Sequence, residues 1–176
     1  MGFEEVVGPQ GEIGQDKVRK EYEKLTRMLI VRKITIATME SCTGGFLSSL
    51  LTDTEGSSEV FRGSYVTYSN EAKILNGVPE EIVERFGVYS VQTAASMAEA
   101  CRRSLKTDIG VGITGSFGNA DPANPDSVPG EVFFSIAGAG GTESFHCTVP
   151  HQSSRFGYKL YMADVVAARL FEIIGR

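Results

Sequence analysis

A hydroxyl-bearing turn at residues 40–45 is the first place where this sequence could do chemistry. It reads Glu-Ser-Cys-Thr-Gly-Gly and follows an apolar run at 34–39. Where a strand turns sharply into a helix, unpaired amides and the helix dipole favour negative charge. Ser41 could attack a carbonyl carbon there, while backbone amides near Thr43, Gly44 and Gly45 receive the oxyanion. The alternative is that Ser41 or Thr43 only caps the helix.

A serine hydroxyl is a weak nucleophile unless a base takes its proton. The chain has two histidines, His146 and His151, far from Ser41, and distant segments can still assemble a site. The run at 67–73, Thr-Tyr-Ser-Asn-Glu-Ala-Lys, offers another base. A lysine against apolar walls loses its proton more readily, so Lys73 could act with Tyr68 as relay. The alternative is a solvated lysine and a tyrosine that fills the core.

Further side chains could complete such a site. Thr114 ends an apolar strand, and ligands of open α/β sheets bind beyond the carboxyl ends of strands. Arg155 would lie on the first turn of the last helix, where its planar fork suits a phosphate. The alternatives are that Thr114 belongs to an ordinary turn at the end of a strand and that Arg155 is simply exposed to solvent. Cys42 is a rival nucleophile, since a helix N-terminus lowers a thiol pKa, or else a packed and inert thiol.

The elements around these residues alternate along the chain. Apolar spacing predicts helices over 15–32, 46–51, 70–76, 79–86, 91–106 (capped by Ser90) and 154–174. Strands are predicted over 34–39, 59–69, 108–114, 131–137 and 143–149, and residues 116–129 form a loop. Strands that alternate with helices and end in a hairpin predict an α/β three-layer sandwich, with a mixed central sheet and helices on both faces. Residues 1–14 are expected to be a flexible arm, and 15–176 a single domain.

Composition narrows the function classes. The 176 residues carry a net charge of −5, which argues against a general electrostatic grip on nucleic acid. The sequence has no run of 18 apolar residues, so no membrane span is predicted. The first ten residues lack the pattern of a secretion signal. The three cysteines form no CxxC pair, so neither a disulfide framework nor a zinc site is indicated. A cytoplasmic protein with no metal and no cofactor is expected.

Taken together, these runs resemble the CinA C-terminal domain family. The resemblance rests on Glu-Ser-Cys-Thr-Gly-Gly at 40–45, Thr-Tyr-Ser-Asn-Glu-Ala-Lys at 67–73, and Thr114-Gly115, in this order. Gly-Val-Tyr-Ser at 87–90, leading into a helix, is also similar to that family. The similarity extends over roughly residues 15–174 of the chain.

The resemblance implies a nicotinamide-nucleotide amidohydrolase. Such enzymes convert nicotinamide mononucleotide and water into nicotinate mononucleotide and ammonia, within the pyridine nucleotide cycle of NAD metabolism. It implies Ser41 as nucleophile, Tyr68 and Lys73 as its activating groups, and Thr114 and Arg155 as substrate-site residues. The only other partner that it implies is a second copy of the chain, in a homo-oligomer.

Two segments depart from the family pattern. Ser-Phe-Gly-Asn-Ala-Asp-Pro at 116–122 stands where the family has a turn rich in proline and glycine. Gln-Ser-Ser-Arg at 152–155 replaces a Gly-Asp-Arg. Two alternatives therefore stay open: a catalytically silent protein that binds pyridine nucleotides on the same scaffold, or a hydrolase of another small amide.

Overall fold

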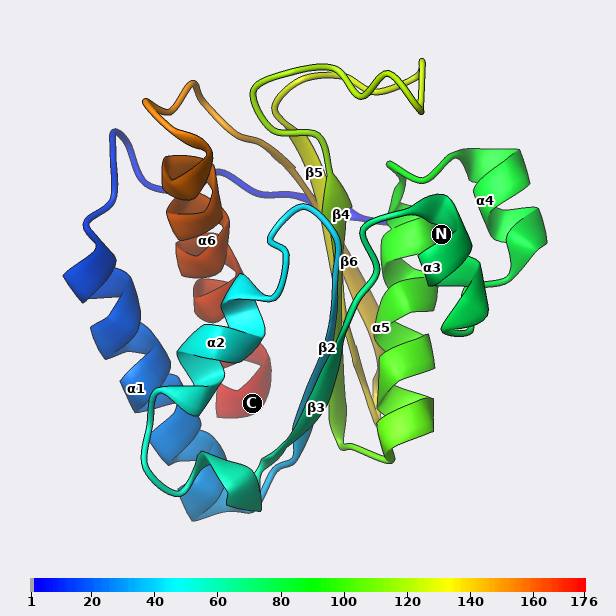
Figure 1. Ribbon diagram of the computed structural model, residues 1–176. Helices are drawn as coiled ribbons and strands as arrows, with labels where there is room; N and C mark the ends of the chain where they lie inside the picture. The colour runs from blue at the N-terminus through cyan, green and yellow to red at the C-terminus, as the bar shows by residue number, and fades with distance from the viewer. Residues whose placement is uncertain (1) are drawn as a thin grey trace.

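The computed structural model describes residues 2–176 and shows a sheet between two layers of helices (Figure 1). The sheet has six strands in the order β1-β6-β5-β4-β2-β3. β2 pairs in parallel with β3 and β4, whereas β4, β5 and β6 run antiparallel. The predicted mixed sheet is therefore confirmed. The strands are β1 (Glu4–Glu5), β2 (Ile36–Glu40), β3 (Phe61–Val66), β4 (Ile109–Gly115), β5 (Glu131–Gly138) and β6 (Gly141–Thr148).

Helices cover both faces of the sheet, as the three-layer prediction requires. One layer contains α1 (Gln15–Arg32), α2 (Phe46–Thr52) and α6 (Arg155–Gly175), and the other contains α3 (Asn70–Leu75), α4 (Glu80–Phe86) and α5 (Val91–Leu105) (Figure 1). A short 3₁₀ helix, η1 (Ser57–Glu59), precedes β3. It shortens the strand that was predicted to begin at residue 59. The predicted cap of α5 is confirmed, because the Ser90 hydroxyl accepts from the Thr93 amide.

Strand β4 lies unusually close to α5, and its glycines allow this approach. A Cβ on Gly110 would stand 2.2 Å from the carbonyl oxygen of Ala98. One on Gly112 would stand 2.3 Å from that of Ala94. Real side chains do not tolerate such distances, so these two glycines let the helix backbone pack directly on the sheet. The tight packing fixes β4, whose carboxyl end borders the site described below.

The N-terminal arm differs from its prediction. Residues 4–5 form β1, which pairs in parallel with Phe145 and His146 of β6. The Val6 amide donates to the His146 carbonyl at 2.9 Å, and the Val6 side chain is buried in the core. The expectation of a loose arm over 1–14 is therefore wrong for residues 4–6. A short pairing segment beside a core valine is too brief to give a periodic signal.

We predict that the hold on β1 weakens as pH rises. The His146 ring contacts the carboxylates of Glu5, at 2.8 Å, and Glu131. Burial alone would lower the His146 pKa, but these two hydrogen-bonded carboxylates raise it above its ordinary value of 6.5. The added stability is therefore complete below that ordinary value and is lost as pH rises through the raised pKa. The protection factor of the Val6 amide in hydrogen exchange should fall over that range. A flat profile, or one unchanged in Glu5→Gln, would contradict the prediction.

Within the described part of the chain, no helix is long and apolar enough to cross a bilayer.

Candidate active site

The parallel strands end together and bring distant segments to one edge of the sheet. Glu40 of β2 is in register with Val66 of β3 and with Ile113 of β4. Two backbone hydrogen bonds continue this register past the strands, from Ser41 to the Ile113 carbonyl and from Thr67 to the Glu40 carbonyl. The turn after β2, the segment after β3 and the end of β4 therefore meet at one place.

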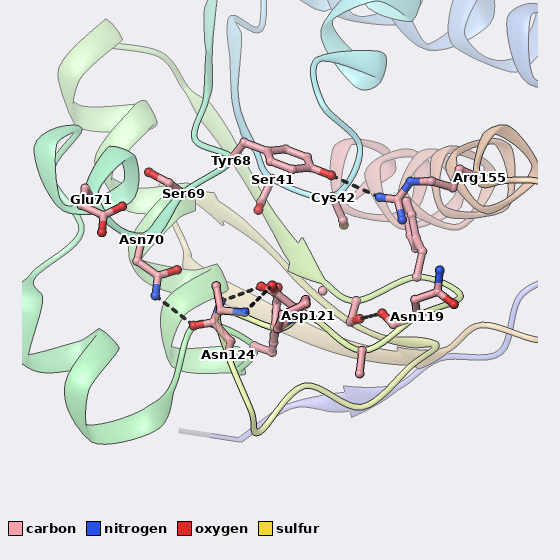
Figure 2. A pocket seen from close by; sticks show the side chains of 17 residues that line it. Ser41, Cys42, Tyr68, Ser69, Asn70, Glu71, Asn119, Asp121, Asn124 and Arg155 are labelled. Atoms are coloured by element: carbon pink, nitrogen blue, oxygen red, sulfur yellow. Dashed lines mark hydrogen bonds between the residues drawn. The ribbon is translucent and has the colours of Figure 1, made fainter.

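A pocket of about 520 Å³ opens at this edge (Figure 2). Its wall is formed by the turn after β2, the start of α3, the loop between β4 and β5, and the first residue of α6. In Figure 2, Ser41 points into the pocket between Tyr68 and Asp121, with Arg155 on one side and Asn70 on the other. The lining residues are Ser41, Cys42, Tyr68, Ser69, Asn70, Glu71, Tyr89, Gly115, Ser116, Phe117, Asn119, Ala120, Asp121, Pro122, Ala123, Asn124 and Arg155.

Lys73 lies directly behind Ser41. Its Nζ atom is 3.1 Å from Ser41 Oγ and 3.0 Å from the carbonyl oxygen of Thr67. The predicted proximity of this amine and this hydroxyl is thus confirmed. Its alternative, a solvated surface lysine, is wrong, because Lys73 is only 1% exposed. Ser69 caps the short helix α3 by accepting from the Ala72 amide, and this fixes the turn that carries Lys73 inward.

Burial changes the proton affinity of this amine. It lowers the pKa of Lys73 from 10.5 to about 8, against the opposing pull of Cys42, Asp121 and Glu71. The cause is the cost of holding an ammonium away from water. Near neutral pH, a minor fraction of Lys73, far larger than for an ordinary lysine, therefore has a free lone pair next to the Ser41 hydroxyl. A neutral amine in that position can accept the hydroxyl proton.

Glu40, the residue before Ser41, organises the turn. Its carboxylate is fully buried and accepts from the Thr43 hydroxyl and from the amides of Gly45, Leu47 and Ser48, at 2.7 to 3.1 Å. It therefore caps α2 from inside the protein, a role that the sequence analysis did not predict. The signal was present, since an acidic residue beside a helix start is a common cap.

This cap changes the expected oxyanion site. The Gly45 amide is bonded to Glu40, and the Gly44 amide donates to the Ser41 carbonyl at 3.0 Å. Both were predicted to face the substrate, and in this structure both are occupied. The remaining two amides of the turn, those of Cys42 and Thr43, face the Cys42 sulfur, where each acts to lower the thiol pKa. The glycines serve the turn itself, because Gly44 and Gly45 have φ angles of 61° and 90°.

Tyr68 and Arg155 meet across the pocket mouth (Figure 2). The Arg155 guanidinium donates to the Tyr68 hydroxyl at 3.2 Å, and it lies over the Phe117 ring at 5.7 Å. Tyr68 is 65% exposed, so it is not the core side chain that the alternative reading expected. Its hydroxyl is hydrogen-bonded to Arg155, whereas Lys73 donates to Ser41 and Thr67, so the predicted relay between Tyr68 and Lys73 stays a prediction. Both residues are placed to contact a ligand.

Thr114 does not reach the pocket. Its side chain is fully buried, and its hydroxyl donates to the carbonyl of Val88 at 2.9 Å. The strand alternation turns it toward α5, whereas its neighbours Gly115 and Ser116 line the pocket. The prediction that Thr114 contacts the substrate is therefore corrected to a structural contact.

Cys42 lines the pocket wall but is poorly suited to attack. Burial, together with the charge of Glu40, raises its thiol pKa from 9.0 to about 12. The helix start that would lower this pKa is already occupied by Glu40. Cys42 is thus a poorer candidate nucleophile than Ser41. His146 pairs with carboxylates on β1 and β5, remote from Ser41, and His151 is not part of the lining.

The loop at 116–129 contributes pocket residues that sequence reasoning took only as turn formers. Asp121 accepts from the Tyr89 hydroxyl and the Asn124 side chain, each at 2.6 Å. Asn124 in turn accepts from the Asn70 side chain at 2.9 Å. These bonds attach the loop to the start of α3 and to the segment before α5. Asp and Asn are frequent in turns, so their side-chain role left no separate signal.

No group of His, Cys, Asp and Glu side chains in the described residues could hold a metal ion.

A profile of the CinA C-terminal domain matches residues 18–164, most of the chain. The chain belongs to the CinA C-terminal domain family. A relative from Acetivibrio thermocellus, named for competence-damage induction, is 43% identical over 151 residues, covering 81% of this chain and 36% of that one. A CinA-like protein of Desulforapulum autotrophicum is 44% identical over 119 residues, 67% of this chain and 28% of that one. The chain thus spans about a third of the length of such curated relatives.

Solved structures agree with the fold. A competence or damage-inducible protein from Enterobacter asburiae superposes with a TM-score of 0.80 at 28% identity, covering 89% of this chain and 98% of that one. The competence/damage inducible protein CihA from Agrobacterium tumefaciens gives 0.80 at 24% identity, covering 96% and 100%. The second similarity supports the CinA fold alone. The resemblance seen in the sequence is confirmed at the level of the family.

Proposed function

We propose that this CinA-domain protein hydrolyses the carboxamide of nicotinamide mononucleotide to nicotinate mononucleotide and ammonia. The observation that supports the proposal most is the contact of 3.1 Å between the buried Lys73 amine and the Ser41 hydroxyl. A buried amine beside an alcohol at a pocket wall is the arrangement that acyl transfer needs. The family membership and the Arg155 guanidinium, which can bind a phosphate, also support the proposal.

In the first step, neutral Lys73 takes the Ser41 proton, and Oγ bonds to the carboxamide carbon. The amides of Cys42 and Thr43, which face the Cys42 sulfur in the absence of substrate, are the donors that we assign to the oxyanion. The Lys73 ammonium then gives its proton to the leaving nitrogen, so that the C–N bond breaks and ammonia departs. An ester to Ser41 remains.

In the second step, Lys73 takes a proton from water, and the hydroxide oxygen bonds to the ester carbon. The C–Oγ bond breaks, and Ser41 recovers its proton from Lys73. Arg155 exchanges the Tyr68 hydroxyl for the substrate phosphate, which its planar fork matches better. Tyr68 thus belongs to the binding group, and Lys73 alone serves as base.

The direct test is ammonia release from nicotinamide mononucleotide by the purified protein, with and without a chelator. We expect turnover that the chelator leaves unchanged. Tight binding of the nucleotide with no ammonia would instead support a catalytically silent binding protein. Turnover of other small amides, but not of this nucleotide, would support a different amidohydrolase. The altered loop at 116–122 is the feature that motivates both alternatives.

Glu40→Gln is predicted to damage the turn that presents Ser41. Both carboxylate oxygens of Glu40 accept hydrogen bonds from N–H and O–H donors. In glutamine one of these oxygens becomes an NH₂ group, which is itself a donor and leaves some of those donors without an acceptor. Unmet buried donors should lower the free energy of unfolding by about 2 kcal/mol, and kcat should fall about tenfold. Alkylation of Cys42 should become faster, because the charge of Glu40 helps to raise its pKa.

Glu59→Gln is the matched control for this change, since Glu59 is exposed on η1. Peptide-level mass spectrometry would follow Cys42 alone. Unchanged alkylation together with unchanged kcat in Glu40→Gln would refute the role given to this carboxylate.

A further inference from the structure

The pocket holds opposite charges on opposite sides. Arg155 supplies a cation at one end, and the carboxylate of Asp121 lies across from it, beneath Ser41 in the view of Figure 2. Asp121 lies in the loop segment that departs from the family pattern. The family resemblance therefore assigns no role to this side chain.

Asp121 is held in place as a negative charge. Its Oδ2 atom accepts from Tyr89 and Asn124 at 2.6 Å, and Oδ1 accepts from the Ala123 amide at 2.9 Å. The hydrogen bond from Tyr89, followed by those from Asn124 and Ala123, lowers the pKa of Asp121 below its ordinary value. An ionised, oriented carboxylate therefore faces the pocket at neutral pH.

The substrate class of the proposed function carries a complementary charge. The pyridine ring of nicotinamide mononucleotide is cationic at its nitrogen, and the carboxamide that meets Ser41 is attached to that ring. With the carboxamide at Ser41 and the phosphate at Arg155, the ring lies in the space that Asp121 borders. A carboxylate is then a natural counter-charge for the ring.

Resting on the proposed function, we propose that Asp121 is a specificity residue that selects the cationic pyridinium form of the nucleotide over uncharged rings. Reduced nicotinamide mononucleotide is the matched comparison. It keeps the ribose, phosphate and carboxamide, but its dihydropyridine ring is neutral. A loop that acts only by shape would treat both molecules alike.

The experiment measures dissociation constants by calorimetry in a Ser41→Ala background, where the nucleotide is not consumed. The pH is set above the Lys73 pKa, because removing a carboxylate also shifts that pKa. Adding Asp121→Asn should weaken binding of the oxidised nucleotide about tenfold, as expected for a lost charge pair at an open pocket wall. Binding of the reduced nucleotide should stay unchanged, which also shows that the loop is intact. Asp126→Asn, with the same charge change outside the lining, should alter neither.

Equal weakening of both nucleotides, no change for either, or no binding of either to the Ser41→Ala protein would overturn this assignment. Ammonia release by the unmodified protein is measured separately. Its failure, with the charge-selective loss intact, would remove the proposed reaction and leave Asp121 as the selector of a bound pyridinium nucleotide. Ammonia release without that selective loss would keep the proposed reaction and remove Asp121 as the specificity residue.

Discussion

Ser41→Ala is expected to lower kcat for ammonia release by roughly 10³-fold or more, since it removes the only group assigned to bond with the substrate carbon. The substitution deletes one oxygen from a side chain that is 5% exposed. Lys73 keeps its contact with the Thr67 carbonyl, so the fold should be preserved. The affinity for nicotinamide mononucleotide should change little, because the phosphate and ring contacts remain.

Ser49→Ala is the matched control, because Ser49 is exposed on the neighbouring helix α2. It should leave kcat unchanged. A Ser41→Ala protein that releases ammonia at the unmodified rate would remove the covalent step. Trapping of the ester at Ser41 by rapid acid quenching, followed by mass spectrometry, gives independent support.

Lys73→Met is expected to lower kcat by roughly 10³-fold, within the range for loss of a positioned general base. In the unmodified protein the rate should rise with pH, because only the neutral amine accepts a proton. The lowered pKa of about 8 sets the midpoint of that rise. Methionine has a similar shape and no proton to exchange, so the rise should disappear along with the activity. The measurement is a rate profile across pH for both proteins.

The control is Lys20→Met, on the exposed face of α1, which should keep both rate and profile. Residues that act as one unit are not additive. The double variant Ser41→Ala with Lys73→Met should therefore lose scarcely more than either single variant. A Lys73→Met protein that retains the pH-dependent rise would assign the base to another group.

The helices and the main strands could be predicted because their signals are local. α1 has its apolar residues at helical spacing, and Ser90 marks the start of α5. The placement of Ser41 and Lys73 in one site could also be predicted, because parallel strands end at one edge of a sheet. The predicted fold class and the family are both confirmed.

The remainder depended on contacts that local patterns do not encode. Whether the hydroxyl of Thr114 faces the pocket or α5 depends on which face of β4 it occupies, and a fully buried strand has no polar alternation to show this. The direction of Tyr68 depends on Arg155, 87 residues later. Glu40 captures the amides of α2 only once the turn is folded. Such pairings are products of tertiary structure.

The hydrogen bond between Tyr68 and Arg155 has a practical consequence. An incoming phosphate and the phenol compete for the same guanidinium, so occupancy of the pocket should release the Tyr68 ring into a different environment. The sequence contains no tryptophan, and tyrosine emission is therefore unmasked. The intrinsic fluorescence of the unlabelled protein should report nucleotide entry, and Tyr68→Phe would identify the residue that supplies the signal.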